Sequence, residues 1–146
     1  MIQKVKNCLL TGIAADAFGN RFIQADLPTG QELWSFSQAA HYLTATCLSI
    51  IDRREVAPVE IGKRMRRYYM EQQLSGLSGD TLRTLTDLVD GYHWEGVGSE
   101  GNEASNAPLL RIAPLAFVLD VAGNEADRET LEAIVQLSHS EENVRH

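Results

Sequence analysis

The sequence has few of the residues that build disulfide scaffolds or metal clusters. It contains two cysteines, Cys8 and Cys47, and no Cys/His grouping with the close spacing that zinc sites need. The four histidines are scattered, and no pair has the i, i+4 spacing that indicates metal ligands on a helix. Because each cysteine lies within an apolar stretch of helical periodicity, we expect both thiols to be reduced and buried in the core.

Long apolar runs and clustered basic residues are also scarce. No apolar stretch reaches the ~20 residues that cross a bilayer, and the N-terminal residues do not resemble a signal peptide. The net charge is −7, and the one basic cluster, residues 63–67, is typical of a solvated helix face, with a patch for a phosphate or an acidic partner as the alternative. We therefore expect a cytoplasmic protein that binds neither membrane nor nucleic acid.

Helical periodicity is what the sequence does contain, and no segment shows sustained alternation of apolar and polar residues. With 146 residues, 44% of them hydrophobic, the chain is near the usual size of one domain, so residues 1–146 are predicted to form a single compact all-α helical bundle. The first helix is expected to stop at Gly19-Asn20, and the fifth to run from Pro108 to Gly123 with a kink at Pro114. The other four are predicted to begin at Ser37, Pro58, Ser78 and about Glu125.

Asp16 has an unusual position in the first predicted helix. The apolar stripe of that helix consists of Val5, Cys8, Leu9, Gly12 and Ile13. Continuing the same spacing places Asp16 on the stripe, where a carboxylate must be hydrogen-bonded, paired or bound to a ligand, because burying a lone charge is costly. Asp16 is therefore a candidate ligand-binding residue, although hydrogen bonds from neighbouring backbone N–H groups are the stronger interpretation.

Three separated stretches resemble the ADP-ribosylglycohydrolase family in order and spacing. Residues 10–19 are similar to the family's opening helix, which ends in Gly-Asp-Ala-x-Gly, with Ala15 in place of the first glycine. Residues 78–94 resemble the family's Gly-x-Thr helix and the segment after it, and residues 106–115 resemble its Asn-Gly-x-x-Met-Arg-x-x-Pro stretch. The resemblance implies the N-terminal half of that family's all-helical fold, with the rest of the domain falling beyond His146.

The acidic residues that the resemblance would imply are missing. Family members present an Asp-Asp-Thr triplet at the start of their second helix, where paired carboxylates reach a divalent metal, but this chain has Phe36-Ser37-Gln38, or Ser37-Gln38-Ala39 if the register slips by one. The glutamate that follows the first helix in the family falls at Ile23, and the second acidic motif belongs to the C-terminal half. We therefore expect no metal cofactor, no catalytic residue and no hydrolysis by the family's metal-assisted mechanism.

Asn106 and Arg111 are the other candidate ligand-binding residues. Arg111 is predicted to anchor the loop before it through carboxylate or carbonyl contacts, with contact to a bound phosphate as the alternative. Asn106 is expected to shape a pocket edge, although its neighbour Ala107 replaces a glycine and restricts the backbone. No histidine and carboxylate partners for Ser37 are evident in the sequence, which leaves a spatial triad open.

The resemblance leads to three hypotheses about function. The first is a degenerate ADP-ribosylglycohydrolase-like protein, a pseudoenzyme that acts by binding an ADP-ribosyl group, a nucleotide or a partner protein. The second is an active hydrolase that uses magnesium or manganese, with acidic ligands from a second chain or from Asp16 and Asp26. The third is a truncated remnant without a specific ligand. Because half of a helical domain should leave an apolar face uncovered, we expect a homodimer or a complex with a second chain.

Overall fold

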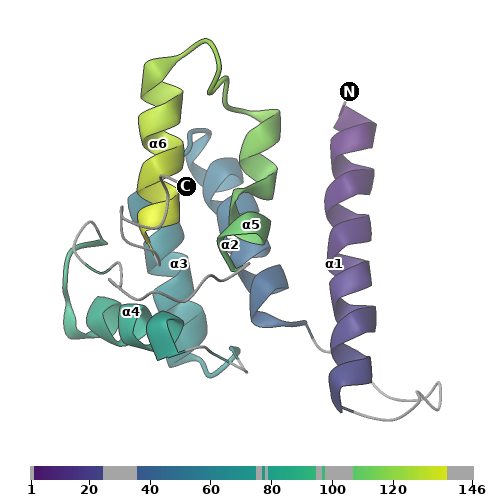
Figure 1. The fold of residues 1–146 in the computed structure, drawn as a ribbon, viewed down its shortest axis with the longest axis vertical. Coiled ribbons are helices and arrows are strands. Elements are labelled where there is room, and N and C mark those ends of the chain that lie inside the picture. The colour runs from purple at the N-terminus through teal and green to yellow at the C-terminus, as the bar shows by residue number, and fades with distance from the viewer. Residues whose placement is uncertain are drawn as a thin grey trace.

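A computed structural model of the chain describes residues 2–24, 36–74, 77, 79–94, 97 and 107–137. The described residues form helices and no strands, which confirms the all-α prediction (Figure 1). The elements are α1 (Ile2–Gln24), α2 (Gln38–Arg53), α3 (Pro58–Met70), α4 (Gly79–Asp90), α5 (Ala107–Ile112), the 3₁₀ helix η2 (Ala113–Phe117) and α6 (Glu125–Gln136).

Local capping sets several of the helix ends. The Ser37 hydroxyl accepts a hydrogen bond from the Ala39 backbone N–H at 3.0 Å, so Ser37 is the N-cap of α2, as predicted. Pro58 occupies the first turn of α3, where its missing N–H costs no helical hydrogen bond. Helix α2 ends where Arg54 adopts the left-handed conformation, with φ 59°, and its N–H bonds to the Ile50 carbonyl.

Two predicted helix ends are wrong. Helix α1 continues through Gly19-Asn20 to Gln24, because Gly19 keeps a helical backbone and costs only about 1 kcal/mol of helix propensity there. Helix α5 ends at Ile112 rather than at Gly123, and Ala113–Phe117 form the 3₁₀ turn η2. Pro114 cannot donate a backbone hydrogen bond to the preceding turn, so the α-helix tightens and stops instead of continuing with a kink.

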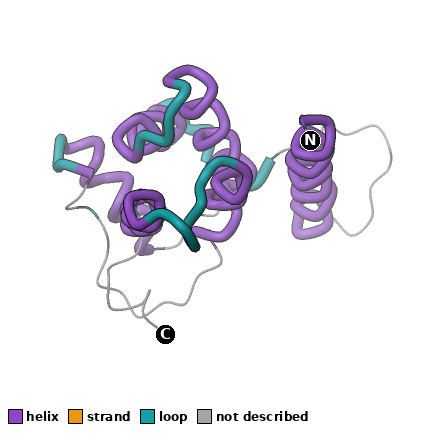
Figure 2. Tube along the Cα trace, turned by 90° about the horizontal axis from the view of Figure 1, so that it is seen from above, coloured by secondary structure: helices purple, strands orange, loops and turns teal. Residues whose placement is uncertain are grey.

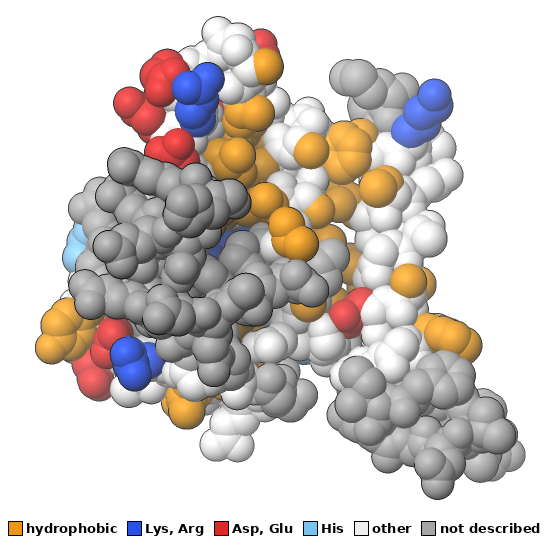
Figure 3. All heavy atoms as spheres, in the orientation of Figure 1, with side chains coloured by type: hydrophobic (Ala, Val, Ile, Leu, Met, Phe, Trp, Pro, Cys, Tyr) orange, Lys and Arg blue, Asp and Glu red, His pale blue; other side chains and the backbone are white. Residues whose placement is uncertain are grey.

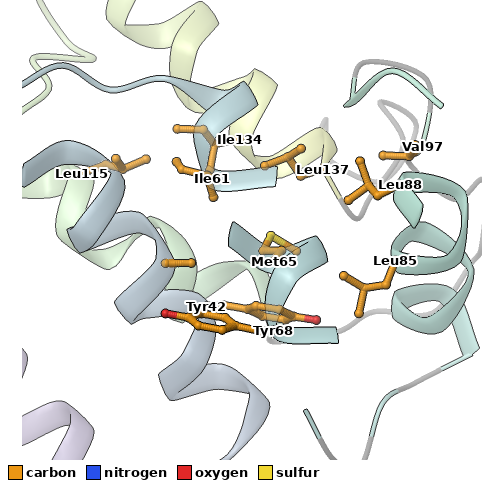
Figure 4. Packing of buried hydrophobic residues seen from close by; sticks show 11 residues of the cluster. Tyr42, Ile61, Met65, Tyr68, Leu85, Leu88, Val97, Leu115, Ile134 and Leu137 are labelled. Carbon is orange, nitrogen blue, oxygen red and sulfur yellow. The ribbon is translucent and has the colours of Figure 1, made fainter. Parts of the chain in front are cut away.

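The buried core lies among the helices that follow α1. Side chains from α2, α4 and α6 converge on Ile61 and Met65 of α3, both fully buried (Figure 4). The cluster consists of Tyr42, Ala45, Ile61, Met65, Tyr68, Leu85, Leu88, Val97, Leu115, Ile134 and Leu137. We call the part of the chain from α2 to α6 the bundle. Its helices enclose one continuous, mostly apolar interior that also buries Arg111.

Helix α1 stands apart from the bundle in both views of the backbone (Figures 1 and 2). Ala17 is the one buried residue among the α1 side chains that the structure describes. Cys8 is exposed and Cys47 is half-buried, so the prediction that both cysteines are core residues is wrong. The described residues meet α1 along one side, and Cys8 lies outside that contact, while Cys47 of α2 lines the open space beside α1.

Candidate functional site

Asp16 lies where α1 meets the start of α2. One oxygen of its carboxylate accepts a hydrogen bond from the Ser37 backbone N–H at 2.9 Å, and the other accepts one from the Ser37 hydroxyl. Both contacts lie at the N-terminus of α2, where unsatisfied N–H groups and the helix dipole favour a negative charge. The half-buried carboxylate therefore joins α1 to α2 and takes part in capping α2, which is the structural role that the sequence favoured.

The arrangement around Ser37 does not follow the order of a catalytic triad. His41 directs Nδ1 to the Ser37 carbonyl oxygen, at 2.9 Å, and its ring packs edge-on against Tyr68 with 5.5 Å between centroids. In a triad the histidine lies between the hydroxyl and the carboxylate, so that it can take the hydroxyl proton. Here the hydroxyl donates directly to Asp16. Sequence reasoning missed this pairing because the 21 residues between the partners give no sign that they meet.

The described side chains do not fit a hard divalent cation. The first turn of α2 carries no acidic residue, and no group of three or more His, Cys, Asp or Glu residues gathers as a metal site in the part of the chain that the structure describes. A magnesium or manganese ion needs several oxygen ligands, and Asp16 supplies one carboxylate that is already hydrogen-bonded twice. Asp26 lies outside the described residues.

Arg111 is fully buried in the bundle. Its Nη1 donates to the Ile134 carbonyl of α6 at 3.2 Å, and its guanidinium lies over the Tyr42 ring, 5.0 Å from the centroid. Its Nε and Nη2, like the Tyr42 hydroxyl, have no hydrogen-bond partner among the described residues. Burial lowers the pKa of Arg111 to about 10 and raises that of Tyr42 to about 12.

The three ligand-binding candidates are therefore placed differently. Asp16 contacts Ser37, the N-cap of α2, and Arg111 contacts Tyr42 in the second turn of that helix, but the two do not hydrogen-bond to each other. The contact shown for Arg111 goes forward to α6, whereas the loop before it and Asn106 lie outside the described residues.

A groove of about 460 Å³ separates α1 from the bundle. Its walls are apolar, and Lys6 contributes the one charged side chain of the lining. Hydrophobic side chains gather along this groove in the space-filling view (Figure 3). Several wall residues are open to solvent: Ile51 is 67% exposed and Val118 is 52% exposed. The lining includes Val5 and Leu9 of α1, Ile50 and Ile51 of α2, Phe117 of η2 and the following Val118.

Comparison with known proteins agrees with the sequence motifs. Residues 1–146 match the family model described as ADP-ribosylglycohydrolase, so the chain belongs to the ADP-ribosylglycohydrolase family. No curated protein and no solved structure gives a significant match to the chain. Among the described residues, no helix is long and apolar enough to cross a membrane.

Proposed function

We propose that this protein is a non-hydrolytic member of the ADP-ribosylglycohydrolase family that acts by binding: its partner is a second copy of the chain, and its ligand an ADP-ribosyl group or a nucleotide. The observation that carries the non-hydrolytic part is the contact between Asp16 and Ser37. Among the described residues, Asp16 is the acidic residue that contacts the start of α2, and its carboxylate takes part in capping that helix.

Metal-assisted hydrolysis would need this end of the molecule to hold an ion. Removing Asp16 from Ser37 to ligate a cation would leave the Ser37 N–H and hydroxyl without their acceptor and would weaken the cap of α2. No neighbouring acid of the α2 first turn could complete the coordination. These costs support a protein that has lost the reaction.

Metal titration tests this part of the proposal. We expect magnesium and manganese to leave the melting temperature unchanged, because an ion that binds only the folded state would raise it. An Asp16→Asn variant should respond as the wild type does. A metal-dependent rise in melting temperature that disappears in Asp16→Asn, together with release of ADP-ribose from a modified protein, would instead establish the active hydrolase.

The partner proposal rests on the surface of α1. From residue 7 to residue 19, Asp16 is the one charged residue, and it contacts Ser37. The outer side of this stretch exposes Cys8 and Leu10, with Leu10 at 53%. Apolar side chains of this stretch therefore stay uncovered by the described residues on its outer side as well as along the groove on its inner side. Both faces belong to one chain, so two copies can cover each other.

Light scattering tests the partner. We expect a dimer at about 50 μM chain that Ile51→Asp converts to a monomer, because the charge would be buried in the interface. Leu82→Asp is the matched control: Leu82 of α4 is 44% exposed and does not line the groove, so this variant should remain dimeric. A wild-type monomer, or equal behaviour of the two variants, would reject the second copy as the partner.

A further inference from the structure

We propose that a pocket between α3 and the turn after α4 binds a planar aromatic ring that carries a phosphate. The pocket has a volume of about 230 Å³ and shares no lining residue with the groove beside α1. None of Asp16, Ser37 and Arg111 lines it. The lining combines two cationic side chains from α3 with three consecutive aromatic residues, Tyr92, His93 and Trp94.

The end of α4 builds the aromatic wall. Gly91 adopts φ 93°, a left-handed conformation that a side chain would strain, and the next N–H, that of Tyr92, bonds back to the Asp87 carbonyl at 3.0 Å. This closure satisfies a carbonyl of the last turn and directs Tyr92–Trp94 toward α3. Trp94 packs against α3 at Gly62, where a Cβ would be in van der Waals contact with the Trp94 Cβ at 3.7 Å.

The aromatic wall suits a flat ring. Trp94 is half-buried against α3, and its ring centroid lies 5.7 Å from that of His93, with 41° between the planes. Tyr92 is 64% exposed, so its ring is open to a ligand. Nucleobases stack on such side chains because every base presents a π-face.

The two cations differ in how far they are neutralised. The Lys63 ammonium lies 2.8 Å from a Glu60 carboxylate oxygen, which Arg53 also contacts at 2.9 Å. These hydrogen bonds, Lys63 first, hold the pKa of Glu60 below its usual value. Arg66 makes no ion pair with the described residues, whereas the adjacent Arg67 pairs with Glu71 at 3.5 Å. Arg66 therefore presents a guanidinium whose planar set of donors matches a phosphate.

The volume of the pocket limits the size of the ligand that it can hold. A volume of about 230 Å³ is below the roughly 300–1,000 Å³ of pockets that take drug-sized molecules. It favours one ring system with one phosphate over an entire dinucleotide. A nucleoside monophosphate has this chemistry, with the base against Tyr92 and Trp94 and the phosphate at Arg66.

Titration with AMP tests the inference on the full chain. Because the sequence holds two tryptophans, a Trp34→Phe background leaves Trp94 as the one tryptophan, whose fluorescence can be excited selectively over that of the tyrosines. We expect saturable quenching with a Kd of about 0.1–1 mM, and little response to adenosine, which lacks the phosphate, or to inorganic phosphate, which lacks the ring. Arg66→Gln should weaken AMP binding by about tenfold. The matched control Arg67→Gln removes the same charge one residue away and should change it by less than about twofold.

Absence of saturable quenching by AMP would overturn the proposal, as would equal losses in Arg66→Gln and Arg67→Gln or equal quenching by adenosine. The inference rests on the proposed function, because it gives a site to the nucleotide ligand proposed there. The AMP titration requires neither a metal ion nor a dimer. Failure to bind AMP is therefore a separate result from detection of hydrolysis in the metal titration, or of a monomer by light scattering.

Discussion

Helix α1 and the bundle stabilise themselves in different ways. In the bundle, α2, α3, α4 and α6 share a core in which Ile61, Met65 and Leu85 are fully buried. In α1 the described side chains include one buried residue, Ala17, while Leu10 and Phe18 remain about half exposed. The bundle therefore derives its stability from its own interior. Helix α1 depends on the Asp16 contact, on the groove and, in our proposal, on a second copy of the chain.

In this protein, the apolar residues that stabilise the fold and those available for association lie in different parts of the molecule. Apolar surface that is buried within a chain stabilises the fold, whereas apolar surface that stays exposed favours association. Substitutions in the bundle should therefore change the free energy of unfolding, and substitutions on α1 should change the oligomeric state more than the fold.

The sharpest contrast is between Ile61→Ala in the bundle and Leu10→Ala on α1. Ile61 is fully buried, so we expect Ile61→Ala to lower the free energy of unfolding by about 3 kcal/mol, from lost burial and the cavity left behind. Leu10 is 53% exposed, and Leu10→Ala should cost less than about 0.5 kcal/mol. Urea unfolding at low chain concentration measures both. Equal losses would show that α1 belongs to the same cooperative core.

Burying the Arg111 guanidinium destabilises the bundle, whereas burying its apolar side chains stabilises it. Its guanidinium is fully buried, and two of its nitrogen atoms, Nε and Nη2, have no hydrogen-bond partner among the described residues. Replacing such a charge with an apolar side chain of similar length, Arg111→Met, should raise the stability by about 1–2 kcal/mol at pH 7. Arg111→Lys keeps the charge and should not. Thermal or urea unfolding compares the three proteins.

The lowered pKa of Arg111 determines the direction in which its effect on stability changes with pH. Burial holds the pKa of Arg111 at about 10, below its unfolded value, so the cost of the buried charge is complete below pH 10 and declines as the pH rises beyond it. The advantage of Arg111→Met should shrink in that range. If Arg111→Met is less stable than the wild type, the guanidinium has an essential partner beyond the Ile134 carbonyl and the Tyr42 ring.

Substitutions at the contact between Asp16 and Ser37, which joins α1 to the bundle, should lower the free energy of unfolding by an intermediate amount. Asp16→Ala removes both acceptors of Ser37 and should cost about 1 kcal/mol, the usual contribution of a helix cap. Ser37→Ala should cost a similar amount, and the double variant should cost less than the sum, because the two changes break one shared interaction. A strictly additive double variant would show that the hydrogen bond between the Ser37 hydroxyl and Asp16 contributes nothing to stability.

The sequence predicts the parts of this molecule that depend on local order. The Ser37 cap, the Pro58 start of α3 and the end of α4 at Gly91 follow from residue chemistry within a few positions. The helical stripe of α1 also identified Asp16 as a residue with a polar partner. That partner could not be predicted, because the meeting of α1 and α2 depends on packing across 21 residues.

Other features depend on what each helix finds to pack against. The periodicity of α1 indicates one apolar face, but not whether that face meets a core or an open groove, and for this reason the expected burial of Cys8 was wrong. The end of α1 was misplaced because Gly19 breaks a helix only where the backbone turns left-handed, and here it does not. The aromatic and basic pocket between α3 and α4 brings together residues about thirty positions apart, which no motif in the sequence joins.

Within the bundle, the smallest expected effect is at the Tyr42 hydroxyl, which is buried without a hydrogen-bond partner among the described residues. Tyr42→Phe should change stability by less than about 1 kcal/mol at pH 7, toward the more stable side, because it removes a buried group that has lost its water. Burial raises the pKa of Tyr42 to about 12, against the opposing effect of Arg111, so the neutral phenol is favoured in the folded chain. Its contribution is complete below pH 10 and is lost as the pH rises through 12, which makes the wild type lose stability relative to Tyr42→Phe in that range. Urea unfolding at pH 8 and at about pH 11 measures the change; a difference that stays constant between the two would show that the hydroxyl reaches solvent or a partner.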